Sequence, residues 1–190
     1  MSFHFLSEIS FRWKSRRKYD IHSPFVYKIW KNMLKDKTVY PGLSVLKNEF
    51  GHLRGKKYHH LLFRINRFYH PFMITLAGSC DSVAMEFLKA GGEGKQIFQE
   101  ITATEGHYQM AILDLAQSEA RLAGYISNIL QHSGEESVLI VWNLRKSHTT
   151  LAIWEDLIRD ARIKIAIDLC RMGLIYFGSG LSKEDFMIRF

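Results

Sequence analysis

The sequence predicts an α/β protein with a mostly parallel sheet, helices on both faces, an antiparallel C-terminal edge and a helical cap at the N-terminus. Three observations predict this class. From Pro71 onward, short apolar runs alternate with segments of helical periodicity, which indicates strands joined by crossover helices. Residues 137–144 (SVLIVWNL) form a continuous apolar run, typical of a strand buried inside a parallel sheet. Residues 1–70 instead carry apolar side chains mostly at helical spacing.

Length and composition fit one compact domain with an extension. The chain has 190 residues, of which 47% are hydrophobic and 24% are charged, as in an ordinary globular protein. We expect a helical cap over residues 1–70 and a single α/β domain over residues 71–190. No apolar run reaches the roughly 18 residues of a membrane-spanning helix, and basic residues follow the apolar ones at the N-terminus, the reverse of a secretory signal. We therefore expect a cytoplasmic protein.

Three helices are predicted in the cap. The first covers residues 2–18, where apolar side chains recur at helical spacing before a basic cluster. The second begins with Ser23 as its N-cap and Pro24 at the first helical position. Residues 38–55 are interrupted by proline and glycine and are predicted to form an irregular connection. The third helix covers residues 56–69, which place one apolar face just before a proline.

The predicted domain begins with a strand, a helix, a second strand ending near Glu105, a long helix, a third strand and another helix. They occupy residues 72–77, 82–92, 95–105, 107–132, 137–144 and 149–161. Three strand-like runs follow in residues 163–190. A parallel return between neighbouring strands needs a crossover of about a dozen residues or more. We therefore expect these closely spaced runs to form the antiparallel edge.

Several motifs carry a family resemblance that spans most of the chain in order. They are HSPFVY at 22–27, the stretch 57–79 that ends in ITLAGS, TEG at 104–106, SVLIVWNL at 137–144 and IAIDLCRMGLIYF at 165–177. Together they resemble a bacterial group of class I S-adenosylmethionine-dependent methyltransferases. The resemblance implies a Rossmann-like fold, S-adenosylmethionine as cofactor, and a small-molecule or macromolecular methyl acceptor that the motifs do not identify.

The resemblance also implies where the cofactor would bind. In such enzymes a glycine-rich turn follows the first strand, and a carboxylate after the second strand takes the ribose hydroxyls. The matching positions, and so the predicted cofactor-binding residues, are Ala77, Gly78, Ser79, Glu105 and Gly106. Glu105 fits two interpretations, a ribose-binding carboxylate and a solvated carboxylate at the end of a strand.

The first turn departs from the family pattern at three positions. Thr75 stands where the family has an acidic residue, Ala77 where it has its first glycine and Asp81 where it has a later glycine. An alanine adds a methyl group where the backbone should approach the ligand, and a positive φ there would add strain. The Asp81 carboxylate would repel the methionine carboxylate of the cofactor. Both changes predict weakened cofactor binding.

A second departure concerns the chemistry. Metal-dependent O-methyltransferases, a related branch, hold a divalent cation with an Asp-Asn or Asp-Asp pair, but here the pair is Trp142-Asn143. Because tryptophan cannot ligate magnesium, we expect no metal site. Only one helix is predicted between Glu105 and Ser137, where the family has another strand that carries a carboxylate. We therefore expect a missing strand and helix, and a pseudoenzyme with weak or no activity and no assigned catalytic residue.

Other polar residues are expected near the carboxyl ends of the strands, where ligands bind in open α/β sheets. They are His107, Asp114, Asn143 and His148. A histidine there could act as a general base, although an exposed polar residue at the end of a loop is the simpler interpretation. His59 and His60 are adjacent on a predicted helix and face different sides, so they do not form a metal site.

The charge distribution supports a rival function. Residues 1–70 hold 15 Lys and Arg against four Asp and Glu, whereas the remaining 120 residues hold 11 against 15. The basic cap could hold an acidic partner such as RNA in a non-catalytic binding or scaffold protein. A solvated helical face that docks on the acidic body is the simpler interpretation. The two cysteines, Cys80 and Cys170, fit reduced thiols.

Overall fold

The computed structural model describes residues 3–15, 21–52, 56–78, 80–92, 94, 97–101 and 107–190. The chain divides into two compact units. One, the sheet unit, comprises Met1–Arg17, Met73–Ser79 and Phe98–Arg189. The other, the helical unit, comprises Lys18–Phe72 and Cys80–Ile97 together with Phe190. Within the described residues, no helix is long and apolar enough to cross a bilayer.

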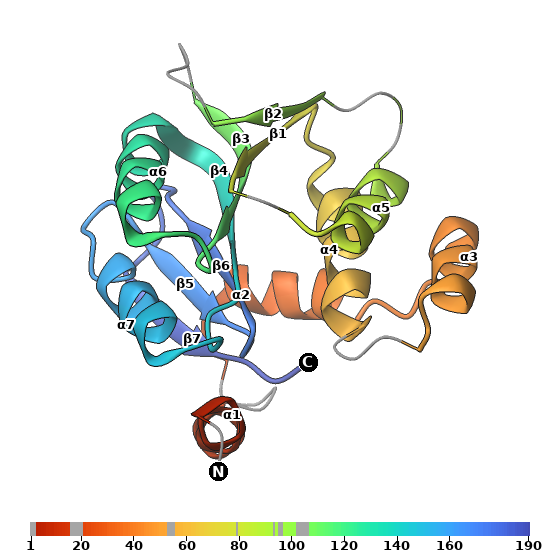
Figure 1. The fold of residues 1–190 in the computed structure, drawn as a ribbon, viewed down its shortest axis with the longest axis horizontal. Coiled ribbons are helices and arrows are strands. Elements are labelled where there is room, and N and C mark those ends of the chain that lie inside the picture. Colours follow the sequence, from red (N-terminus) through yellow and green to blue (C-terminus); the bar gives the residue numbers. More distant parts are fainter. Residues whose placement is uncertain are drawn as a thin grey trace. The chain divides into compact units, whose positions relative to one another are not determined.

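The sheet has seven strands in the order β2-β1-β3-β4-β6-β5-β7 (Figure 1). The strands are β1 Met73–Ala77, β2 Ile97–Glu100, β3 Tyr108–Asp114, β4 Ser133–Trp142, β5 Ile165–Asp168, β6 Met172–Tyr176 and β7 Glu184–Met187. Strands β1, β3 and β4 are parallel to one another, and β6 is antiparallel to both of its neighbours, β4 and β5. The predicted α/β class, with a mostly parallel sheet and antiparallel pairing toward the C-terminus, is confirmed.

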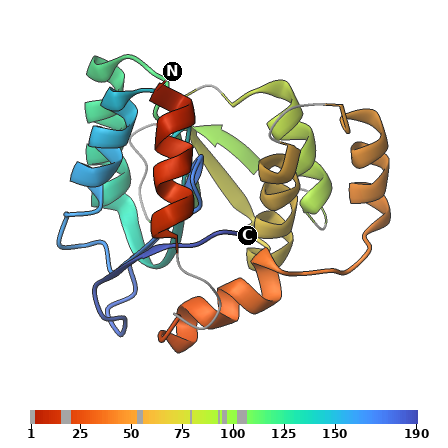
Figure 2. The same cartoon turned by 90° about the horizontal axis from the view of Figure 1, so that it is seen from below.

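Among the described residues, three helices belong to the sheet unit: α1 Phe3–Lys14, α6 Glu119–His132 and α7 His148–Leu157. Helices α6 and α7 lie side by side on one face of the sheet (Figures 1 and 2). Leu122 and Ile129 of α6 and Trp154 of α7 form one buried cluster with Leu139 of β4. Helix α1 is tied to the same unit by a 2.7 Å ion pair between Glu8 and Arg171.

The long helix predicted over residues 107–132 is wrong in its first half. Residues 108–114 form strand β3, and the helix α6 begins only at Glu119. The reason is tertiary, because β3 lies between β1 and β4 and its side chains from Met110 to Leu113 are all buried. A short apolar run of this kind is ambiguous between strand and helix until the sheet is assembled.

The C-terminal edge also differs in one pairing. Strands β5 and β6 form the expected antiparallel pair, but β7 pairs with β5 in parallel. The chain achieves this because β7 lies on the side of β5 away from β6, so the connection that includes β6 serves as the crossover. The assumption that closely spaced runs must all be antiparallel neighbours is therefore wrong for β7.

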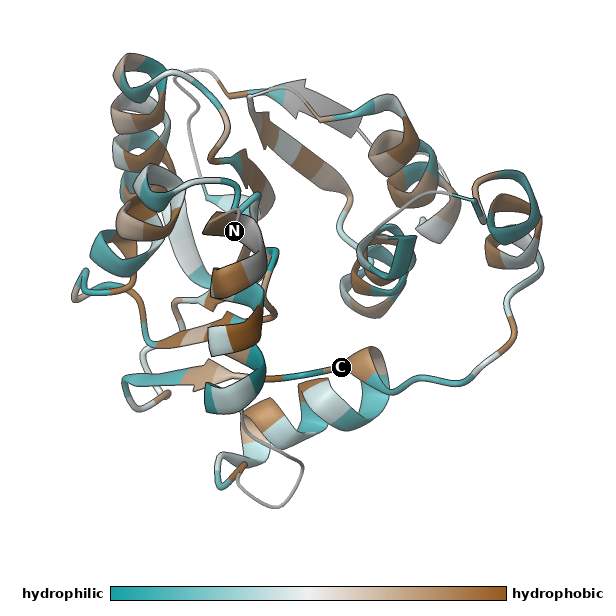
Figure 3. Ribbon diagram, turned by 60° about the horizontal axis from the view of Figure 1, so that its bottom comes forward, coloured by the Kyte–Doolittle hydropathy of each residue, from teal (hydrophilic) through white to brown (hydrophobic). Residues whose placement is uncertain are grey.

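The helical unit contains α2 Pro24–Ile29, the π-helical turn η2 Trp30–Leu34, α3 Pro41–Glu49, α4 Lys56–Tyr69 and α5 Ser82–Gly91. The predicted helix start is confirmed, since the Ser23 hydroxyl accepts a 3.4 Å hydrogen bond from the Val26 amide. The irregular connection predicted over residues 38–55 is wrong, because α3 lies inside it. In Figure 3 the helices carry both polar and apolar residues along their length, as amphipathic elements do.

Helix α3 forms because its proline suits the first helical turn and its apolar side chains find partners. Pro41 occupies that first turn, where its missing N–H costs nothing. Leu43 and Leu46 are buried in a cluster with Phe63 of α4 and Phe87 of α5. Helices α4 and α5 are further joined where the Asn66 amide donates to the Leu88 carbonyl at 2.5 Å.

His60 makes the stability of the helical unit depend on pH. Its ring packs against Phe87 at a centroid distance of 5.5 Å, and its Nε2 is buried with no hydrogen bond among the described residues. Burial, followed by the charges of Lys47 and Arg64, lowers the pKa of His60 to about 4 from 6.5. The unfolded chain therefore binds a proton that the folded chain rejects between these two pH values.

We expect the free energy of unfolding to fall by about 1–3 kcal/mol as the pH is lowered from about 6.5 to 4. Denaturant unfolding across this range measures the slope, which His60→Gln should flatten because glutamine does not titrate. His52→Gln is the matched control, since His52 is exposed. An equal slope in wild type and His60→Gln would contradict this assignment.

Candidate functional site

The carboxyl ends of β1, β3 and β4 meet at one edge of the sheet unit. Ala77 at the end of β1 pairs with Leu113, and Asp114 at the end of β3 is in register with Trp142 of β4. In open α/β sheets this edge is where ligands bind. The described residues that follow or end these strands at this edge include Gly78, Asp114 and Asn143.

Gly78 turns the chain at the end of β1 in a conformation that favours glycine. Its φ is +104°, and a Cβ built on it would lie 2.8 Å from Cγ of Gln117. A side chain at this position would be strained by the backbone conformation, and the Gln117 side chain would have to move aside. Ala77 is the last residue of β1, and it is buried and has no positive φ. The backbone strain predicted at Ala77 is therefore absent, because Gly78 and not Ala77 adopts the left-handed conformation.

Asp114 and Asn143 form a polar pair at this edge. The Oδ1 atom of Asp114 accepts a 2.7 Å hydrogen bond from Nδ2 of Asn143 and a 2.9 Å hydrogen bond from the Ala116 amide. Asn143 itself has a φ of +65°, a left-handed conformation that asparagine tolerates better than most residues. The expectation that only a helix lies between Glu105 and Ser137 is wrong, because β3 lies there and ends in a carboxylate.

The donor set at this edge argues against a metal of the type used by the related O-methyltransferases. Trp142 stands in register with Asp114 and offers an indole, which cannot ligate a hard divalent cation. Among the described residues, no group of three or more His, Cys, Asp or Glu side chains is arranged to hold a metal ion. The side chains of Asp114 and Asn143 are instead hydrogen-bonded to each other.

Of the two histidine candidates, His107 is not placed as expected, whereas His148 follows the carboxyl end of β4. His107 precedes β3, and its ring lies against Gly134 at the start of β4. It is thus at the amino ends of these parallel strands, and the prediction that it lies at their carboxyl ends is wrong. His148 opens α7, and its ring centroid lies 3.7 Å from that of Phe3 in α1. One side of this imidazole is therefore covered by an aromatic ring.

Three of the predicted cofactor-binding residues, Ser79, Glu105 and Gly106, lie outside the described residues. Strand β2 ends at Glu100, earlier than the predicted end near Glu105. The backbone amide of Ile101 still donates a 2.9 Å hydrogen bond to the Leu76 carbonyl of β1. The ribose-binding role of Glu105 stays a prediction.

Asp81 has a structural role in the helical unit. It is the N-cap of α5, and its Oδ1 atom accepts a 2.7 Å hydrogen bond from the Ala84 amide. The Nε2 atom of His59 lies 3.7 Å from the same carboxylate. The nearby His59 side chain and the hydrogen bond from the Ala84 amide, outweighing burial, lower the pKa of Asp81. This capping role explains an aspartate where the family has a glycine, without reference to any ligand.

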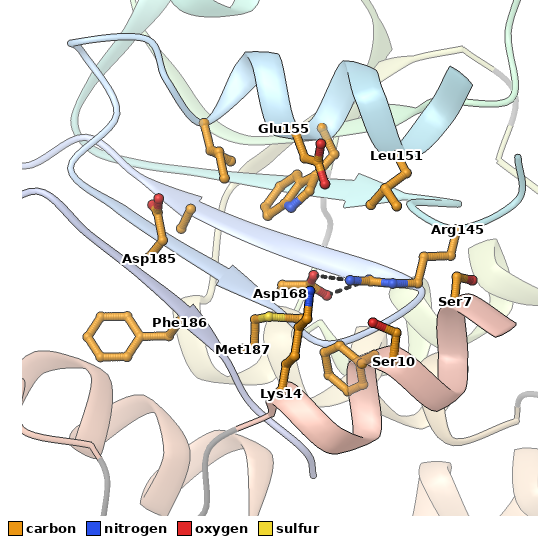
Figure 4. A pocket seen from close by; sticks show the side chains of 14 residues that line it. Ser7, Ser10, Lys14, Arg145, Leu151, Glu155, Asp168, Asp185, Phe186 and Met187 are labelled. Atoms are coloured by element: carbon orange, nitrogen blue, oxygen red, sulfur yellow. Dashed lines mark hydrogen bonds and ion pairs between the residues drawn. The ribbon is translucent and has the colours of Figure 1, made fainter. Parts of the chain in front are cut away.

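A separate cavity of about 430 Å³ lies between α1, α7 and strands β5 and β7 (Figure 4). Its wall includes the buried ion pair of Arg145 and Asp168, with Phe11 and Trp154 as apolar neighbours. The guanidinium of Arg145 also lies 4.9 Å from the ring centroid of Phe11. Sequence reasoning missed this pair, because nothing in the sequence places residue 145 beside residue 168.

Comparison with solved structures identifies the fold. A methyltransferase from Geobacter sulfurreducens matches with a TM-score of 0.53 at 11% identity, covering 76% of this chain and 93% of its own. An SAH-bound methyltransferase from Podospora anserina matches with a TM-score of 0.51 at 11% identity, covering 84% and 98%. No protein-family model and no curated protein matches the sequence. The chain therefore has the α/β fold of the class I methyltransferases.

Proposed function

We propose that this protein binds S-adenosylmethionine at the carboxyl edge of β1, β3 and β4, and that it is a methyltransferase with weak or no catalytic activity. The observation that carries the proposal is Gly78, a left-handed glycine directly after the first strand of a methyltransferase fold. Such a turn leaves backbone N–H groups accessible to a ligand, which is the function of glycines in nucleotide-binding turns.

The residues at this edge fit the cofactor in part. Gly78 and its neighbours Ala77 and Ser79 would line the cofactor with backbone and small side chains, and Glu105 and Gly106 would meet its ribose. S-adenosylmethionine supplies a methyl group on a sulfonium that is already an activated leaving group. The chain would contribute mainly by holding and aligning the reactants, since proximity provides much of the rate in such a transfer.

Weak catalysis is proposed from the polar groups that the edge offers. Oδ1 of Asp114 already accepts two hydrogen bonds, from Asn143 and from the Ala116 amide. Trp142 takes the position of an acidic ligand. A general base must reach the proton that it abstracts, and a carboxylate engaged in this way is a poor candidate for that role.

Calorimetric titration with S-adenosylmethionine and S-adenosylhomocysteine tests the proposal. We expect both ligands to bind, with dissociation constants between about 1 μM and 1 mM. Glu105→Ala should weaken binding by about tenfold, because a carboxylate bound to ribose hydroxyls makes charge-assisted hydrogen bonds. Glu136→Ala, which removes an exposed carboxylate of β4, is the matched control.

Two results would count against parts of this proposal. The absence of binding heat at about 1 mM of either ligand would refute the proposed cofactor site. Equal affinities for wild type and Glu105→Ala would remove the ribose role of Glu105 and favour the solvated carboxylate.

A second candidate function is a non-catalytic binding or scaffold protein that holds an acidic macromolecule such as RNA. It is supported by the excess of 15 basic over four acidic residues in the first 70 positions. In that case an RNA oligonucleotide binds with an affinity that falls steeply with salt, while S-adenosylhomocysteine does not bind.

A further inference from the structure

The helical unit contains a second, smaller cavity that is rich in cationic donors. Its volume is about 230 Å³, below the roughly 300–1,000 Å³ of clefts that take drug-sized molecules. Three elements line it: the π-helical turn η2, the segment before α3 and the last turns of α4. The residues of its wall are Asn32, Asp36, Tyr40, Arg64, Arg67, Phe68 and His70.

Arg64 and Arg67 bring two guanidinium groups to this cavity from one side of α4, since they are three residues apart. Nη1 of Arg64 donates a 3.3 Å hydrogen bond to the Leu34 carbonyl, which orients the side chain. Its Nε is buried and has no hydrogen-bond partner among the described residues. A buried N–H of a charged group without an acceptor is costly.

The one acidic group of the cavity wall is already occupied by local donors. Oδ1 of Asp36 accepts a 2.8 Å hydrogen bond from the Thr38 amide, and Oδ2 accepts a 2.9 Å hydrogen bond from the Tyr40 hydroxyl. The ring of Tyr40 in turn lies 4.9 Å from the guanidinium carbon of Arg67. Two guanidinium groups against one engaged carboxylate leave the cavity with a net positive charge.

The backbone at two of these positions is irregular. Asn32 lies in η2, a π-helical turn, and such turns occur frequently at functional sites. His70 follows α4 with a φ of +46°, a left-handed conformation that is uncommon for histidine. These irregular backbone conformations agree with a binding site. The side chains of Asn32 and His70 add an amide and an imidazole to the donors of the cavity.

We propose that this cavity binds the phosphate group of a small phosphorylated molecule. Guanidinium groups match the planar, two-point hydrogen bonding of phosphate oxygens, and a terminal phosphate carries close to two negative charges at neutral pH. The small volume suits such a group and not an entire nucleotide. This inference is independent of the cofactor site, because all of these residues belong to the helical unit.

Titration with inorganic phosphate, followed by calorimetry and by ³¹P NMR at constant ionic strength, tests the inference. Wild type should bind phosphate, and Arg67→Gln and Arg64→Gln should each weaken binding by about tenfold or more. Lys31→Gln is the matched control, because it removes the same charge from an exposed residue of η2 that does not line the cavity. It should change the affinity by less than about twofold.

Parallel titrations with acetate and with a short RNA oligonucleotide distinguish the source of the anion. Binding of phosphate but not acetate supports a phosphate site. Tighter binding of RNA, lost equally in Lys31→Gln and Arg67→Gln, would overturn the proposal and indicate a diffuse basic surface. Absence of phosphate binding at about 10 mM would also overturn it. Thermal unfolding shows whether each variant is folded. If Arg64→Gln does not fold, the phosphate affinity of Arg67→Gln alone tests the proposal.

Discussion

Arg145→Met should lower the free energy of unfolding by about 3–5 kcal/mol, the cost of leaving a buried charge without its partner. The side chains of Arg145 and Asp168 are only 5% and 8% exposed. Nη1 of Arg145 donates to Oδ1 of Asp168 at 2.8 Å and Nη2 donates to Oδ2 at 2.5 Å (Figure 4). Nη1 also donates to the Cys170 carbonyl at 2.6 Å, so the substitution removes three hydrogen bonds together.

Two further variants separate this explanation from a general loss of packing. Adding Asp168→Leu to Arg145→Met should recover much of the loss, because replacing a whole buried ion pair by apolar groups is often nearly neutral. Arg159→Met, which breaks an exposed ion pair with Asp156 at 2.7 Å, should cost less than about 1 kcal/mol. Urea unfolding at neutral pH measures all of them. If the single and double variants are equally destabilised, the unpaired charge is not the cause.

The same pair gives the single variant a distinctive pH dependence. Burial raises the pKa of Asp168, and without Arg145 this rise should be larger because its main stabilising partner is gone. A carboxyl group whose pKa is higher in the folded state does not destabilise the fold at a pH below its unfolded pKa of about 3.9. As the pH rises from there through the folded pKa, the free energy of unfolding falls. The deficit of Arg145→Met should therefore shrink toward acidic pH.

Local signals explain which elements could be predicted from the sequence. The second helix begins where expected because Ser23 and Pro24 act through contacts within one helical turn. Strand β4 was equally predictable, since a continuous apolar run is typical of a strand buried inside a parallel sheet. Both signals lie entirely within the segment that they specify.

The elements that could not be predicted depend on partners distant in sequence. Residues 108–114 are a strand because β1 and β4 lie on either side, and their spacing alone also allows a helix. Helix α3 forms although Gly42 follows Pro41, because Leu43 and Leu46 are buried against α4 and α5. In both cases tertiary burial decides the outcome over local propensity.

The candidate site, like the fold, could be predicted from the sequence only in part. Gly78 could be found from its position after an apolar strand. The Asp114–Asn143 pair required knowing that residue 114 ends a strand beside β4, which the sequence assigned to a helix. The guanidinium groups of Arg64 and Arg67 share a helix face by spacing alone, but the cavity that they line depends on η2 and on the segment before α3.

Gly78→Ala should destabilise the protein by about 2–4 kcal/mol. A non-glycine residue at positive φ costs roughly 1–2 kcal/mol, and φ at Gly78 is +104°. The added methyl group would also lie 2.8–2.9 Å from Cγ, Cδ and Nε2 of Gln117. Overpacking of this kind adds about 1–3 kcal/mol, or less where the flexible side chain moves away.

A double-mutant cycle with Gln117→Ala separates these two contributions. Removing the Gln117 side chain relieves the overlap but not the backbone strain, so Gly78→Ala should still cost about 1–2 kcal/mol in that background. Gly180→Ala is the control, because nothing lies within 4 Å of a Cβ built there and its φ is outside the left-handed range. If Gly78→Ala is as mild as Gly180→Ala in denaturant unfolding, the turn after β1 lacks the left-handed glycine. The observation on which the cofactor proposal depends would then be lost, whatever the fold.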